Sequence, residues 1–422
     1  MKNTIKQEFG ISNSQYGALQ SSVSIVNTIL PIIGGIFLDS FGTSTGSVVT
    51  TVLITSGNIL VALSTHNASL STMVVGRILY GIGSGTVVIV QETILSQWFK
   101  GRSLAAVIAL LLTVSRLASF SAQATVIPIA NWMGWWGYGF WFSALLCVFS
   151  FVMNLIYLGL MRTIKMDGGC QRQMELMRRK KSFKWGKLMY LPHSFWLVAA
   201  MEFLLGGSWG CFLHINSNAH AAATASVAQI MPVILMPFLG LCVDRHGKRT
   251  WMMIGSGVAM LVPMILLEYT RLPPVIGMVL FSVSLALGPV GLVSSVPVIL
   301  PLSLVGTGMG IIKSGTNVGA TLFDISVGLL QDATPDKGYS LVILFFIVIA
   351  SLAIAAGITL CVLDRTMYHS LLDRSRQEAA KDTLTDTKAS ELTKNKANYL
   401  YGGLFATLCV TSWVLFGIFV LF

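Results

Sequence analysis

The chain has 422 residues, of which 54% are hydrophobic and only 11% charged, and its mean hydropathy is +0.75. A soluble protein of this length would have too little polar surface to cover so many apolar side chains, so the composition excludes a soluble domain. The formal net charge of +11 comes mainly from basic residues in the loops between apolar segments, which predicts a polytopic membrane protein and no nucleic-acid partner.

Twelve apolar segments of about 20 residues predict one bilayer crossing each. The first segment is not preceded by a cleavable signal peptide, because residues 1–14 are polar, and we expect it to act as the insertion signal itself. In chain order, the predicted helices cover 14–38, 46–64, 71–97, 103–127, 134–161, 194–219, 224–243, 250–268, 273–293, 300–330, 339–363 and 399–422.

The loops divide into a strongly basic set and a nearly neutral set. If the loop after Asp39 faces the cytosol, most of the 28 lysine and arginine residues fall in cytosolic segments, above all in 162–187 and 365–396. This is a strong positive-inside signal, and it predicts the orientation. The sequon Asn67-Ala68-Ser69 then lies on the luminal side, where Asn67 is a candidate glycosylation site.

A short motif occurs twice at a constant offset along the chain. It consists of a glycine, an aspartate four residues later and a second glycine three residues after that. The two copies are Gly35, Asp39 and Gly42, and Gly240, Asp244 and Gly247. Two similar halves in one orientation are typical of parallel repeats about an axis along the membrane normal, with a substrate site at mid-depth between them. The predicted fold is therefore all-α, with two parallel helical-bundle repeats.

The two predicted halves differ in helix number. The helix over 224–243 follows a complete helix over 194–219, whereas its counterpart over 14–38 follows only polar residues. We infer that the first helix of the ancestral repeat is absent from this chain. The predicted organisation is a five-helix bundle over 1–161, a basic cytosolic linker over 162–193, a six-helix bundle over 194–363, a charged cytosolic linker over 364–398 and an appended transmembrane helix over 399–422.

Local motifs add a resemblance to a known family. The stretch from Gly240 to Arg249 resembles the signature loop of the major facilitator superfamily, and the Asp39 loop is a reduced copy without the basic residues. Residues 14–365 also resemble the lysosomal dipeptide transporters of this superfamily, the major facilitator superfamily domain-containing protein one group. The residues that carry this narrower resemblance are Gly76-Arg77, Gly81-Ile82-Gly83, Gln91-x-Thr93, Trp98-Phe99-Lys100-Gly101, Ser115-Arg116-Leu117, Gly306-Thr307, Gly310 with Ser314, Asn317 and Gly319, and Asp332 with Gly338-Tyr339.

This resemblance implies an alternating-access uniporter that moves dipeptides from the lysosome lumen to the cytosol. It implies that Arg116 holds the peptide carboxylate. The family's glutamate for the peptide amino group corresponds to Gly85, so this chain lacks that carboxylate. The implied partners are a small-molecule substrate, membrane lipid and a glycosylated accessory subunit, as the animal family uses.

Charged residues inside the predicted helices are a functional signal of their own, because a charge in the bilayer is costly unless it faces a cavity or a partner. Counted from the basic turn between their helices, Arg116 and Gly85 lie about 21 and 22 Å along the axis, and Glu92 about 12 Å. Lys313 lies about halfway along the helix predicted over 300–330. Two cations without a level acid predict a positive cavity that favours a carboxylate-bearing substrate.

The same residues also have structural interpretations. Arg116 could form an ion pair with Glu92, and Lys313 could pair with Glu202 or Asp324, which would leave the cavity less positive. Glu202 and Asp324 are also candidate proton sites, because a carboxyl group in a dry helix interior favours its protonated form. The candidate substrate-binding residues are Arg116, Lys313, Gly85, Glu92 and Asn317. The candidate gating residues are Asp39, Gly42, Asp244, Arg245 and Gly247, since an aspartate at a helix end can cap the N–H groups of a neighbouring helix.

The sequence predicts no enzyme and no cofactor. No histidine or cysteine residues have metal-ligand spacing, and no serine lies in the context of a nucleophile. The predicted function is secondary transport of dipeptides or related small carboxylates toward the cytosol, in a lysosomal or vacuolar membrane or, as a second location, the plasma membrane. The alternatives are an organic-anion or monocarboxylate transporter, or a non-transporting truncated membrane protein in which the absent helix exposes polar surface to lipid.

Overall fold

The computed structural model describes residues 8, 13–67, 69–99, 103–166, 190–215, 219–270, 274–301, 303–333, 340–375, 378 and 396–421. Within these ranges the chain forms helices and turns and no strand, which confirms the predicted all-α class. In chain order the elements are α2 (Asn13–Phe41), α3 (Thr43–Asn67), α4 (Leu70–Phe99), α5 (Leu104–Trp132), α6 (Tyr138–Met166), α8 (His193–Met201), the π-helical turn η2 (Glu202–Gly206), α9 (Gly207–Ile215), α10 (Ala219–His246), α11 (Arg249–Tyr269), α12 (Pro274–Ile299), α13 (Val305–Ala333), α14 (Ser340–Met367) and α16 (Ala397–Leu421).

Every predicted span corresponds to a helix, and eight helices in the described ranges are long and apolar enough to cross a membrane by length and composition. The helix expected over 300–330 begins later, at Val305, after a turn in which the Leu304 N–H group donates to the Pro301 carbonyl oxygen at 2.9 Å. The span expected over 194–219 consists of α8, η2 and α9 in series. Most of the linker predicted over 162–193 lies outside the described residues.

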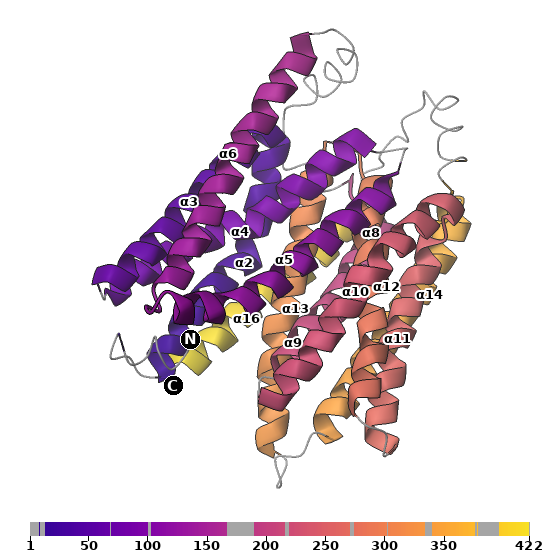
Figure 1. The fold of residues 1–422 in the computed structure, drawn as a ribbon. Helices are drawn as coiled ribbons and strands as arrows, with labels where there is room; N and C mark the ends of the chain where they lie inside the picture. Colours follow the sequence, from indigo (N-terminus) through magenta and orange to yellow (C-terminus); the bar gives the residue numbers. More distant parts are fainter. Residues whose placement is uncertain are drawn as a thin grey trace.

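The helices form two halves that share a boundary of four helices. The N-terminal half comprises α2 to α6, and the C-terminal half comprises α8 to α14. At the boundary α2 packs along α13, and α5 packs along α10. Figure 1 shows the two groups together at the end where α5 and α13 begin, with their opposite ends further apart. We call the end where they meet the clamped end, and the positive-inside pattern predicts that it faces the cytosol.

Small residues allow the boundary helices to approach closely. A β-carbon on Gly35 would collide with the carbonyl oxygen of Gly306, so α2 and α13 cross there backbone to backbone. On the other side of the boundary, a β-carbon on Gly240 would lie 2.5 Å from the β-carbon of Ala109. Gly35 and Gly240 are the first glycines of the two motif copies, so the repeat places the same close helix crossing on both sides.

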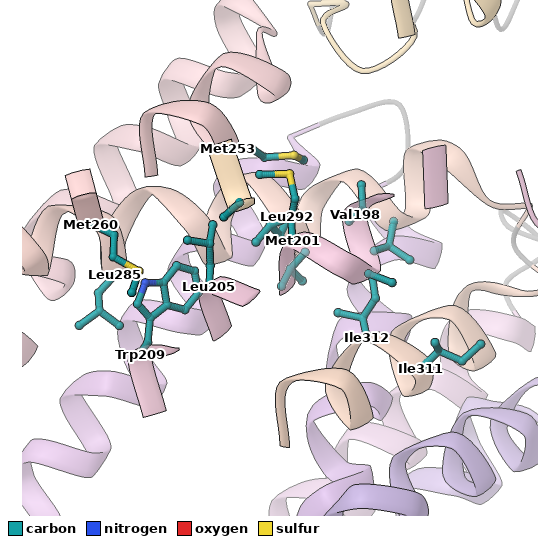
Figure 2. Close-up of a cluster of buried hydrophobic side chains, with 14 of the residues drawn as sticks. Val198, Met201, Leu205, Trp209, Met253, Met260, Leu285, Leu292, Ile311 and Ile312 are labelled. Atoms are coloured by element: carbon teal, nitrogen blue, oxygen red, sulfur yellow. The ribbon is translucent and has the colours of Figure 1, made fainter. Parts of the chain in front are cut away.

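Most of the large hydrophobic core belongs to the C-terminal half. Figure 2 shows side chains from α8 to α9, α11, α12 and α13 gathered in one cluster, and Trp209 donates its indole N–H to the Ser284 hydroxyl oxygen at 3.0 Å. The N-terminal half is more open. Only 6% of the most apolar stretch of α6 is buried, against 33% for α14, the last helix of the other half.

The appended helix α16 lies across the boundary between the halves. Near its start, the Asn398 side chain donates to the Leu191 carbonyl oxygen and accepts from the Trp196 indole N–H, both at 3.0 Å. Further along, Trp413 donates its indole N–H to the Thr28 hydroxyl oxygen at 2.8 Å. The first two contacts belong to the C-terminal half and the third to α2, so α16 joins the halves.

Candidate functional site

A carboxylate near the end of α2 joins the two halves. Asp39 accepts hydrogen bonds from the backbone N–H groups of Gly306 and Thr307, at 3.1 and 2.7 Å, and from the Thr307 hydroxyl group at 2.6 Å. These N–H groups lie in the first turn of α13, where a helix offers them no internal acceptor and its dipole favours a negative charge. Asp39 therefore caps a helix of the opposite half. We call this contact the Asp39 clamp.

The second motif copy builds the same contact in the other direction. Asp244, near the end of α10, accepts hydrogen bonds from the backbone N–H groups of Ala105 and Ala106 at 3.1 and 2.8 Å. In both clamps the capped residues are the second and third of their helix, α13 in one case and α5 in the other. We call this contact the Asp244 clamp. The two predicted gating aspartates thus form a symmetric pair of contacts between the halves.

The second glycine of each motif copy ends the helix that carries the aspartate. Gly42 and Gly247 have φ angles of +88° and +71°, which a residue with a side chain rarely adopts. Their N–H groups donate to the carbonyl oxygens of Leu38 and Val243, both at 2.8 Å. The chain turns directly after the last helical turn, and this leaves each aspartate facing the neighbouring half.

The basic residues of the second motif copy serve a different contact. The Arg245 side chain is exposed and makes no hydrogen bond or ion pair within the described residues, so its predicted gating role stays a prediction. The buried arginine is Arg249, which donates to the Leu372 carbonyl oxygen at 3.2 Å. Beside it, the Thr250 hydroxyl group donates to the Asp373 carboxylate at 2.6 Å. This end of the motif anchors the segment after α14, a role that we did not predict.

Three charged side chains come together between α4, η2 and α13, and we call them the polar cluster. Glu92 and Glu202 are only 3% and 5% exposed, and Lys313 acts electrostatically on both carboxyl groups. From the clamped ends of their helices they lie about 10, 14 and 12 Å along the axis, so they are nearly level. Because α13 starts at Val305, Lys313 faces two level acids. The expectation that Lys313 lies at a level without an acid is therefore wrong. The structural alternative, in which Lys313 lies beside Glu202, fits.

Glu202 is pressed against α13 by close helix packing. Its Oε1 atom accepts a hydrogen bond from the Thr316 hydroxyl group at 3.0 Å, whereas Oε2 is buried without a hydrogen-bond partner among the described residues. Next to it, a β-carbon on Gly207 would lie 2.8 Å from the α-carbon of Gly319. Glu202 opens the π-helical turn, and such turns occur frequently at functional sites.

Gly85 and Asn317 both contact Asn27 of α2, a residue that was not among the candidates from the sequence. A β-carbon on Gly85 would collide with the side-chain oxygen of Asn27 on α2, and that oxygen is buried without a partner within the described ranges. Asn317 donates its side-chain N–H groups to the backbone carbonyl oxygens of Asn27 and Lys313, at 2.8 and 3.0 Å. An amide inside the apolar stretch 14–38 was the signal that could have identified Asn27.

Arg116 stands apart from the polar cluster. It lies about 18 Å along α5 from the clamped end, where a bilayer-spanning helix is near mid-depth, and its side chain is half-buried. Among the described residues no charged group acts on its guanidinium, and the alternative ion pair with Glu92 is not formed. A positive group in this position is available to an anionic ligand.

The remaining candidates lie away from these sites. Asp324 is about 28 Å along α13 from the clamped end, where Cys211 of α9 donates a hydrogen bond to it, so it cannot pair with Lys313. Asn67 is exposed as the last residue of α3, at the opposite end from the clamps. No group of three potential metal ligands is present in the part of the chain that the structure describes.

Comparison with known proteins identifies the fold family. The profile described as "Major Facilitator Superfamily" matches residues 1–216 and again residues 193–422. The chain belongs to the major facilitator superfamily. The first match contains the N-terminal half and the second contains the C-terminal half, with an overlap over residues 193–216. As a member of this superfamily the chain is a multi-pass membrane transporter and not an enzyme.

The relatives and solved structures agree with this family. The lysosomal dipeptide transporter MFSD1 of Mus musculus is 26% identical over 400 residues, which cover 89% of this chain and 84% of that protein. The Homo sapiens protein of the same name is 25% identical, with the same coverage. Among solved structures, the proton:xylose symporter XylE has a TM-score of 0.66 at 16% identity, covering 91% of this chain and 94% of XylE. The transporter FucP in an outward conformation has a TM-score of 0.64 at 13% identity, covering 84% and 92%. At these identities the two structures support the fold alone.

Proposed function

We propose that this member of the major facilitator superfamily carries dipeptides or related small carboxylates from the lumen of a lysosome or vacuole to the cytosol. The observation that carries the proposal is Arg116, a half-buried guanidinium near mid-depth on which no charged group of the described residues acts. The MFSD1 proteins at 25–26% identity support a dipeptide as cargo and a lysosomal location. The glycosylated accessory subunit implied by the resemblance stays a prediction.

The two clamps support alternating access. Both clamps link one half to the first turn of a helix in the other half, so they hold the clamped end together. A solute that enters from the opposite end can reach the cytosol only after both contacts break. Hydrogen bonds of a carboxylate to backbone N–H groups are strong enough to favour one state and weak enough to open, at about 1.5–3 kcal/mol each.

The amino end of the cargo is the point at which this chain departs from the family pattern. Gly85 has no side chain, and the space beside it holds the amide oxygen of Asn27, which carries no formal charge. The site would therefore require a carboxylate, at the level of Arg116, more strongly than it requires an amino group. This favours a second candidate cargo, an organic anion or N-blocked peptide, over a strict requirement for a free amino terminus.

The test is uptake of labelled dipeptide into liposomes that contain the purified protein. Arg116→Ala removes a charge-assisted contact worth about 2 kcal/mol, which corresponds to about thirtyfold in apparent affinity. Arg365→Ala, at the clamped end of α14, is the matched control and leaves uptake unchanged. A dipeptide with an amidated carboxyl end should not compete, whereas an N-acetylated dipeptide should. Absence of saturable uptake by the parent protein under every gradient would refute transport.

A further inference from the structure

The interface between α2 and α13 and the interface between α5 and α10 are built differently beyond the clamps. The helices α13 and α5 are in the same register relative to the clamps, because each clamp caps the second and third residues of its helix. Val305 of α13 and Leu104 of α5 are the first residues. Residues at equal positions along the two helices therefore compare the two interfaces directly.

The tenth residue of each helix carries a buried hydroxyl group, and its partner differs. On α13, Ser314 donates its hydroxyl hydrogen to the Thr28 backbone carbonyl oxygen of α2, in the other half. On α5, Thr113 donates to the carbonyl oxygen of Ala109, one turn earlier in its own helix, at 2.8 Å. Serine and threonine often satisfy their hydroxyl groups in this local way inside a helix. Of these two groups, the one at the α2–α13 interface joins the halves.

The thirteenth residue shows the same difference near mid-depth. Asn317 of α13 donates a side-chain N–H group to the Asn27 backbone carbonyl oxygen of α2 at 2.8 Å, about 18 Å along the axis from the start of its helix. At the same position of α5, Arg116 makes no hydrogen bond or ion pair within the described residues. In the part of the chain that the structure describes, hydrogen bonds therefore join α2 and α13 from the clamp to mid-depth, whereas they join α5 and α10 at the clamp alone.

Packing between the clamp and mid-depth follows the hydrogen bonds. A β-carbon on Gly310, the sixth residue of α13, would collide with the Pro31 carbonyl oxygen, so the backbones of α13 and α2 touch there. The sixth residue of α5 is Ala109, which belongs with Met236 of α10 to a small buried apolar cluster. Apolar contacts constrain the relative orientation of two helices less than directional hydrogen bonds do. The α2–α13 interface is therefore the more firmly fixed of the two.

We propose that the clamped end opens asymmetrically: the α2–α13 interface is a hinge at mid-depth, and the halves separate mainly between α5 and α10. A rigid-body rotation of one half against the other preserves contacts near its axis and breaks contacts far from it. The hydrogen bonds of Ser314 and Asn317 lie about 14 and 18 Å from the start of α13, so they lie near the axis and persist. Both clamps lie far from it and break. This inference concerns the motion alone and does not depend on what the protein carries.

The asymmetry also determines the route of a solute. Because the α2–α13 interface stays closed at mid-depth, the path through the clamped end runs beside α5 and α10. Arg116 belongs to α5, so a ligand that its guanidinium holds leaves along the moving interface. The half-buried arginine and the polar contacts of the hinge thus take the same helix position in the two repeats but serve different parts of the cycle.

The first experiment measures how fast two single cysteines react with a membrane-impermeant maleimide in nanodiscs, and it needs no substrate. Thr113→Cys and Ser314→Cys occupy the same helix position, in a background in which all six native cysteines are replaced by serine or alanine. Asp39→Asn and Asp244→Asn, each introduced alone, favour the open state. In both clamp variants, labelling of Thr113→Cys should become about thirtyfold faster, while labelling of Ser314→Cys should change by no more than about twofold.

Asp39→Asn is the stricter variant, because it weakens the clamp of the α2–α13 interface and should still expose the other interface. Ser256→Cys, buried in α11 within the C-terminal half, reports general unfolding and gives the rate that is subtracted from both. Equal acceleration at the two positions, greater acceleration at Ser314→Cys, or none at Thr113→Cys would each overturn the hinge.

The second experiment leaves the interface residues unchanged and measures distances between spin labels. One pair, Phe41→Cys with Ser303→Cys, reports on α2 and α13, and the other, Leu110→Cys with Leu241→Cys, reports on α5 and α10. With both clamp aspartates changed to asparagine, the second distance should lengthen about twice as much as the first. The second pair lies about 8–9 Å closer to mid-depth, so a symmetric opening would move the first pair more. Equal or greater lengthening of the first distance would overturn the proposal, and so would two unchanged distances.

Discussion

The two halves of the chain are alike at the clamped end and unlike away from it. At the clamped end each half offers one aspartate to the first turn of a helix in the other, at matching helix positions. Away from the boundary, the C-terminal half packs α8, η2 and α9 against α13 and α14, and no described element plays this part beside α5 and α6. The repeat has therefore kept the gate symmetric while the two bundles differ.

This difference assigns unequal tasks to the halves. The C-terminal half is the better-packed body, and it holds Glu202 and Lys313 in place through η2 and α13. The N-terminal half contributes Glu92 and Arg116 from helices with more exposed surface. We expect the N-terminal half to deform more easily during the transport cycle, and the following substitutions test whether the asymmetry is real.

The largest effect is expected from truncating one phenylalanine on the last helix of each half. Phe346 on α14 is fully buried, whereas Phe149 on α6 is 57% exposed. Phe346→Ala should destabilise the protein by about 3 kcal/mol because it leaves a cavity. Phe149→Ala should change the unfolding free energy by no more than about 0.5 kcal/mol. Thermal unfolding in detergent measures both, and equal losses would mean that Phe149 is buried in the solubilised protein.

The next largest effect is expected at the two clamps. Both aspartates accept hydrogen bonds from two backbone N–H groups, and the Thr307 hydroxyl group also donates to Asp39. Each aspartate-to-asparagine change should favour opening of the clamped end by about 2 kcal/mol. Thr307→Val removes only the hydroxyl bond and should favour opening by about 1 kcal/mol. Spin labels at Phe41→Cys and His246→Cys, with Cys147, Cys170 and Cys242 replaced by serine, read the opening as a distance between α2 and α10. An unchanged distance in both aspartate variants would contradict the role of the clamps.

Sequence reasoning succeeded where one stretch of chain decides the outcome. Long apolar runs predicted the helices, and the repeated glycine and aspartate motif predicted that Asp39 and Asp244 lie at equivalent places. It failed where two helices must be placed side by side. The level of Lys313 depended on where α13 begins, and the role of Arg249 depended on the distant segment around Leu372. The approach of Asn27 to Gly85 is likewise a property of packing, which no local pattern encodes.

The smallest predicted effect concerns α16, which belongs to neither repeat. Phe405 of α16 lies against Gly315, two residues and about 200° around α13 from Lys313, so the helix covers the side facing away from the polar cluster. Trp413→Phe removes its hydrogen bond to Thr28 on the N-terminal half and should favour opening by about 1 kcal/mol.

Trp196→Phe is the matched control for this helix. It also removes one indole hydrogen bond to α16, but its partner Asn398 and its own helix α8 stay together when the halves separate. The spin-label distance should therefore widen in Trp413→Phe and not in Trp196→Phe. Equal widening in both variants would mean that α16 acts by stabilising the C-terminal half alone. Widening in Trp413→Phe alone would show that α16 links the two repeats, although it has no counterpart in either of them.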